Sequence, residues 1–154
     1  MVDDKTTESL NKVLKQTKPE KISEYLEKNA SSMVEGSKPF YDYMTRILKK
    51  KGLKQQEVFI NADISDRYGY KLIQEEKHTR QRDTIIRLCL AAKFTLLEAQ
   101  RALKIYGMPS LYAKIPRDAV LIIAFNTGIY EISSVNSLLS ENGLETLRPC
   151  SQEL

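Results

Sequence analysis

Apolar side chains recur at three- and four-residue steps through most of this chain, and that spacing restricts its fold more than any other feature. The clearest stripe is Phe40, Tyr43, Met44, Ile47 and Leu48. Such spacing puts the apolar side chains on one face of an α-helix, whereas a half-buried strand alternates them every second residue. Most of the few glycines and prolines lie between the stripes, where helices end. The pattern therefore predicts an all-α fold.

Local signals predict where these helices begin and end. Lysines 49–51 followed by Gly52 are typical of a helix C-terminus, Ser65 of an N-cap, and Thr95 with Glu98 of a capping box. The predicted helices span residues 7–16, 19–29, 40–51, 55–62, 65–75, 80–94, 95–106, 116–126 and 133–141.

The order of these helices suggests three regions. Residues 1–37 form an N-terminal arm of two short helices, ending in a linker at 30–39. Residues 38–107 hold five helices, and residues 108–154 form a C-terminal helical extension with a short tail. The arm could pack on its own domain, on a second copy of the chain or on another protein partner.

Charge is distributed unevenly among these regions. Residues 1–37 carry a net charge of −1, residues 38–117 a net charge of +9 and residues 118–154 a net charge of −4. A basic block between a neutral arm and an acidic tail is expected when one segment meets a polyanion, although lysine and arginine also simply solvate helix surfaces.

Two short helices joined by a tight turn can present the second helix to a DNA major groove. The run from Leu53 to Tyr68 resembles the lambda-repressor-like (XRE-type) helix-turn-helix family. In that family a glycine-leucine-polar-glutamine stretch opens the first helix of the motif, and an aliphatic-serine pair, here Ile64 and Ser65, opens the recognition helix. The resemblance covers residues 40–107. It implies a five-helix bundle acting as a transcription regulator on double-stranded DNA, commonly as a homodimer.

The family pattern also implies which side chains meet DNA. Gln55 would reach a phosphate or a neighbouring base contact, and Arg67 would bind guanine in the groove. The alternative is that these charged residues are ordinary surface residues and that the tyrosines pack. The expected DNA-binding residues, with His78 as a further neighbour of the backbone, are Gln55, Ser65, Asp66, Arg67, Tyr70, Lys71, Lys77 and Arg80.

The chain departs from the family pattern at several positions of the motif. Phe59 stands at a usual alanine, Asp63 at the usual glycine of the turn, and Gly69 at a usual branched aliphatic residue. Glu75-Glu76 replaces the glycine that usually ends the recognition helix. Phe59, Tyr68 or Tyr70 could supply the volume that Gly69 lacks. The alternative function is a protein-binding adaptor on a repurposed scaffold.

Two features lie outside the motif. The dipeptides Arg82-Asp83 and Arg117-Asp118 each stand at a helix start, where aspartate favours the helix dipole, so we expect a structural role for them.

Residues 120–125 are apolar almost all round, which predicts a buried helix. That helix could complete a monomeric core, meet the N-terminal arm or form a symmetric dimer.

Other functions find little support in the sequence. His78 is the only histidine and has no catalytic partner nearby, and the chain has no zinc-ligand spacing or glycine-rich phosphate loop, so we expect no enzyme, metal or cofactor. No apolar run is long enough to span a membrane, and the N-terminus lacks signal-peptide character. The expected location is therefore the cytoplasm, where a disulfide between Cys89 and Cys150 is possible but not favoured.

Overall fold

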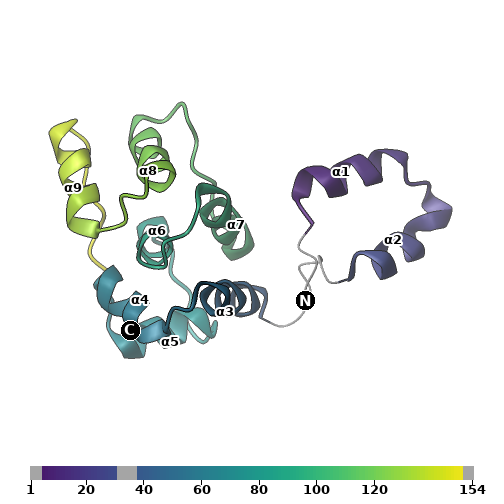
Figure 1. Ribbon diagram of the computed structural model, residues 1–154, viewed down its shortest axis with the longest axis horizontal. Helices are drawn as coiled ribbons and strands as arrows, with labels where there is room; N and C mark the ends of the chain where they lie inside the picture. Colours follow the sequence, from purple (N-terminus) through teal and green to yellow (C-terminus); the bar gives the residue numbers. More distant parts are fainter. Residues whose placement is uncertain (1–4, 31–37, 151–154) are drawn as a thin grey trace. The chain divides into compact units, whose positions relative to one another are not determined.

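The computed structural model describes residues 5–30 and 38–150, and every regular element within these ranges is helical. The prediction of an all-α chain is therefore confirmed for these residues. The chain divides into two compact units, Met1–Ser37 and Lys38–Leu154 (Figure 1). In chain order the elements are α1 (Thr7–Gln16), η1 (Pro19–Lys21), α2 (Ile22–Lys28), α3 (Pro39–Lys51), α4 (Gln55–Ala62), α5 (Asp66–Ile73), α6 (Arg82–Ala91), α7 (Leu96–Tyr106), α8 (Pro116–Thr127) and α9 (Ile132–Glu141).

The first unit is a pair of short helices whose ends are joined by a side-chain hydrogen bond. The Thr6 hydroxyl caps α1 by accepting a hydrogen bond from the Ser9 amide at 3.1 Å. The Lys5 ammonium donates to the side-chain oxygen of Asn29, which joins the start of α1 to the end of α2. Neither helix has a buried residue, and the predicted apolar faces of both are largely exposed. Residues 31–37 of the predicted linker lie outside the described residues.

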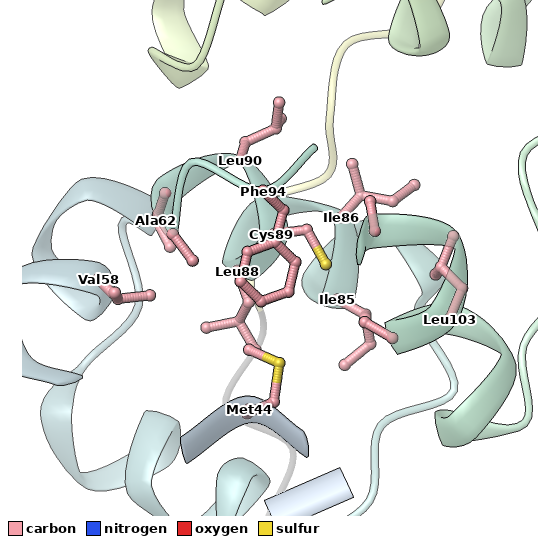
Figure 2. Packing of buried hydrophobic residues seen from close by; sticks show 14 of the residues in the cluster. Met44, Val58, Ala62, Ile85, Ile86, Leu88, Cys89, Leu90, Phe94 and Leu103 are labelled. Carbon is pink, nitrogen blue, oxygen red and sulfur yellow. The ribbon is translucent and has the colours of Figure 1, made fainter. Parts of the chain in front are cut away.

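Helix α6 forms the centre of the second unit. It packs against α4, α7 and α9, and Figure 1 shows other helices of this unit around it. Every residue of α6 from Asp83 to Ala91 is buried, including the polar Asp83, Thr84 and Arg87. Figure 2 shows Leu88 and Cys89 of α6 near Phe94 and Met44. The stripe predicted on α3 is buried in the same core.

The C-terminal extension belongs to this same unit. Helix α8 packs on α7 and α9, and α9 packs on α6. Within this unit the predicted burial of residues 120–125 is confirmed for one face of α8, where Leu121, Ala124 and Phe125 are buried while Ile123 is 55 % exposed. The buried residues lie three, four or one position apart, which is the spacing of one helix face.

Two arginine–aspartate pairs link the start of α6 to the start of α8. Arg117 donates from Nη1 and Nη2 to the two carboxylate oxygens of Asp83, each at 2.8 Å. Arg82 donates to both oxygens of Asp118, and Nη1 lies 3.1 Å from Oδ2. Each Arg-Asp dipeptide thus supplies the arginine of one pair and the aspartate of the other. The expected structural role is therefore a cross-link between two helices, beyond the helix-dipole effect predicted from the sequence.

Because of these contacts, the stability of the folded state depends on pH. Burial alone would raise the pKa of the Asp83 carboxyl, but hydrogen bonds from Arg117 and from the Arg148 amide outweigh burial and lower the pKa below its ordinary value of 3.8. A carboxylate with a lowered pKa stabilises the folded state above the ordinary pKa, and that contribution disappears as the pH falls through the lowered value. We therefore expect the urea midpoint of unfolding to fall as the pH drops below 3.8.

The Asp83→Asn variant isolates this contribution. It should be less stable than wild type at neutral pH and should lose less stability on acidification, because it has no carboxylate to protonate at this position. Asp42→Asn, at an exposed position in the first turn of α3, is the matched control and should keep the wild-type acid dependence. Parallel pH profiles for wild type and Asp83→Asn would contradict this account.

Candidate nucleic-acid interface

Helices α4 and α5 have eight residues each and are joined by a three-residue turn, Asp63 to Ser65. Asp63 adopts the left-handed conformation at φ 57°, which a short polar side chain tolerates better than most, so aspartate can replace the glycine usual at this position. Ile64 follows and is buried. The Ser65 hydroxyl then caps α5 by accepting a hydrogen bond from the Tyr68 amide at 3.3 Å, as predicted. The local signals thus produce two helices with a tight turn.

Helix α5 has a buried side and an exposed side. Tyr68, Gly69, Leu72 and Ile73 are all buried. The opposite side carries most of the residues predicted to meet DNA: Ser65, Asp66, Arg67 and Tyr70 are exposed, and Lys71 is half-buried. The structure therefore brings these predicted side chains together on one helix face.

Phe59 and Gly69 form a matched pair between α4 and α5. A Cβ atom placed on Gly69 would lie 2.4 Å from Cδ1 of the Phe59 ring, far inside van der Waals contact. The ring is completely buried. It also meets Tyr70 edge to face, with centroids 5.0 Å apart. Of the three side chains that could supply the volume Gly69 lacks, Phe59 lies directly against the glycine, so the large residue on α4 compensates for the small one on α5.

The residues predicted to contact the DNA backbone differ in exposure. Arg80 is exposed and Lys77 is half-buried in the segment that follows α5. Gln55, the first residue of α4, is half-buried, and its Oε1 atom is buried without a hydrogen-bond partner among the described residues. Lys54, which the sequence analysis did not assign, is exposed immediately before Gln55. Its position beside a predicted phosphate contact makes Lys54 a further candidate for that role.

Residues after α5 are held to α7 by an aromatic contact. His78 stacks on the ring of Tyr106, with centroids 4.3 Å apart and an interplanar angle of 12°. The Tyr106 hydroxyl accepts a hydrogen bond from the Thr79 amide at 2.8 Å. Burial raises the pKa of Tyr106 to about 12, so the hydroxyl is neutral at physiological pH. This contact gives His78 a packing role in addition to its expected position near the DNA backbone.

Charge across the motif is balanced. Residues 54–80 contain five basic and five acidic side chains, namely Lys54, Arg67, Lys71, Lys77 and Arg80 against Glu57, Asp63, Asp66, Glu75 and Glu76. Further positive charge lies on α3, where Lys49 and Lys50 are exposed in the last turn. The excess positive charge of the middle region is therefore carried largely outside the motif itself.

Within residues 5–30 and 38–150, no group of three His, Cys, Asp or Glu residues could hold a metal ion. Cys89 and Cys150 are free thiols, and burial raises the pKa of both. In the same part of the chain, none of the helices combines the length and the apolar character needed to cross a bilayer.

Comparison of the chain with protein-family models, with curated proteins and with solved structures returns no match.

Proposed function

We propose that this protein is a non-enzymatic, sequence-specific DNA-binding regulator that places α5 in the major groove. The observation that carries this proposal is that α5 is buried on one side and exposed on the other. One side is anchored in the core, while Asp66, Arg67 and Tyr70 are exposed on the other. A helix held in this way can enter a groove about 12 Å wide.

The basic residues of the predicted interface have distinct roles in this proposal. Arg67 reads a guanine through its guanidinium, while Lys71, Lys77 and Arg80 bind phosphates without reading sequence. Cytoplasmic residence, a symmetric dimer that reads two half-sites and a protein partner for the N-terminal arm complete the proposal.

Two substitutions separate base reading from phosphate binding. Lys71→Ala should weaken binding to all duplexes about equally and should reduce the slope of log K against log salt by about 1. Arg67→Ala should instead lose about 1–3 kcal/mol of preference at one base position. Binding of a randomised duplex pool at two salt concentrations, followed by sequencing of the bound fraction, measures both effects.

The control is Lys104→Ala, an exposed lysine in the last turn of α7, which should leave affinity and preference unchanged. Equal losses on every sequence from Arg67→Ala would remove that residue from base reading. Absence of salt-dependent binding by the wild-type chain would remove DNA as the partner.

A protein-binding adaptor is the second candidate function. It is favoured by the balanced charge of residues 54–80 and by Ile60, which is 73 % exposed on α4. Tyr70 adds a further apolar surface at 36 % exposure. Aromatic and aliphatic side chains of this kind commonly anchor protein interfaces. The adaptor would bind no DNA in the titration above, even at low salt.

A further inference from the structure

A pocket of about 290 Å³ lies where the starts of α6 and α8 meet the segment that follows α9. Four arginines line it, Arg80, Arg82, Arg117 and Arg148, together with the carboxylates of Asp83 and Glu145. Lys or Arg side chains gathered in a concave site are the usual protein partners of anions.

Two of these arginines are held rigidly by the reciprocal pairs. Arg117 donates to Asp83, and its Nε and Nη2 also donate to the backbone oxygens of Glu145 and Thr146. Arg82 binds Asp118, which is completely buried. Neither guanidinium can leave the pocket without breaking several hydrogen bonds. The pocket wall is therefore preorganised, which reduces the entropy cost of binding a ligand.

The charges of the other two arginines are not neutralised by a paired carboxylate. Among the described residues, Arg80 and Arg148 form no ion pair. The Asp83 carboxylate already accepts three hydrogen bonds, from Nη1 and Nη2 of Arg117 and from the Arg148 amide. The four arginines outnumber the three acids Asp83, Asp118 and Glu145, so the site has an excess positive charge.

We propose that this pocket binds the phosphate group of a small ligand, either free phosphate or a small phosphate monoester. Planar guanidinium groups match phosphate oxygens two at a time, and a phosphate group has more acceptor oxygens than a carboxylate has. The volume is near the lower end of small-molecule sites, which leaves room for a phosphate with a compact organic group. Such a ligand would bridge α6, α8 and the C-terminal segment.

Two substitutions that each remove one charge at the rim test the proposal in opposite directions. The amide signals of Asp83 and Arg148 are followed by NMR while inorganic phosphate replaces chloride at constant ionic strength. Arg148→Gln should raise the Kd by roughly tenfold, because a charged hydrogen-bond donor is lost. Glu145→Gln should lower the Kd by about threefold, because a repelling charge is removed. Both side chains are exposed, and the backbone bonds of residues 145 and 148 are retained in the variants.

A comparison of two ligands identifies the source of the phosphate group. Glycerol phosphate binding more tightly than inorganic phosphate would assign the site to a monoester, whereas the reverse order would assign it to free phosphate. Lys104→Gln on α7 should change neither Kd. The proposal is overturned when Arg148→Gln and Glu145→Gln both bind phosphate as wild type does, or when acetate binds as tightly as phosphate. Arg80 also belongs to the proposed DNA interface, so the test leaves it intact, and it uses no DNA.

Discussion

Gly69→Ala should destabilise the protein by about 2–3 kcal/mol, although the same change inside a helix ordinarily stabilises by up to about 1 kcal/mol. The reason is the new Cβ atom, which would lie 2.4 Å from the Phe59 ring. Because that ring is buried on all sides, it cannot move aside without disturbing the core. Urea unfolding followed by circular dichroism measures the change.

The partner substitution tests whether the two residues act as a unit. Phe59→Ala alone should cost about 3–5 kcal/mol because it leaves a cavity. In the Phe59→Ala/Gly69→Ala double variant, the methyl group of residue 69 enters that cavity, so the combined cost should be at least about 1 kcal/mol below the sum of the single costs.

Phe125→Ala on α8 provides the matched control for this cycle. Phe125 is also a buried phenylalanine, but α8 packs on α7 and α9. The loss of stability in the Phe125→Ala/Gly69→Ala double variant should therefore equal the sum of the two single losses within about 0.5 kcal/mol. A Gly69→Ala protein more stable than wild type would show that the ring does not restrict this position.

The second large effect is expected at Asp118, where Asp118→Ala should cost about 3–5 kcal/mol. Its carboxylate is completely buried and accepts hydrogen bonds from Arg82 and from the Tyr112 amide at 3.0 Å. Removing it leaves the Arg82 guanidinium, with a side chain only 23 % exposed, without its counter-ion. The free energy of unfolding in urea measures this loss.

Removing both charges separates the ion pair from simple loss of packing. The Arg82→Met/Asp118→Leu double variant should be clearly more stable than Asp118→Ala, because no unpaired charge remains buried. A loss below about 1 kcal/mol for Asp118→Ala would place this pair among exposed ion pairs, which contribute little.

Local signals predicted the helices well because they act within a few residues. Gly52 has the left-handed conformation at φ 70° that ends α3, and Thr95 with Glu98 forms the complete capping box that begins α7. The same is true of the Ser65 cap, so the position of α5 and its row of exposed polar residues could be predicted from the chain alone. Predicted ends differ by a few residues, as at residues 80–94, where α6 spans Arg82–Ala91. The helix ends earlier than predicted because Lys93 adopts the left-handed conformation at φ 56° and the Phe94 amide bonds back to the Cys89 carbonyl.

Contacts between distant residues could not be predicted in this way. The sequence shows the dipeptides Arg82-Asp83 and Arg117-Asp118, but periodicity within one helix contains no information on which helices become neighbours. The pocket between them depends on that same packing and on Arg148, which no motif marks. Likewise, Ile123 belongs to an apolar run, yet among the described residues of the second unit its side chain stays 55 % exposed.

By itself, the sequence determined the helices, their caps and the row of polar residues on α5, because each depends on spacing and hydrogen bonds within a few residues of the chain. Only the tertiary structure decided that Phe59 occupies the space beside Gly69, that each arginine pairs with the aspartate of the other dipeptide, and that four arginines share one pocket. Those outcomes depend on the shape and charge that one helix presents to another, and such complementarity exists only after the helices have packed.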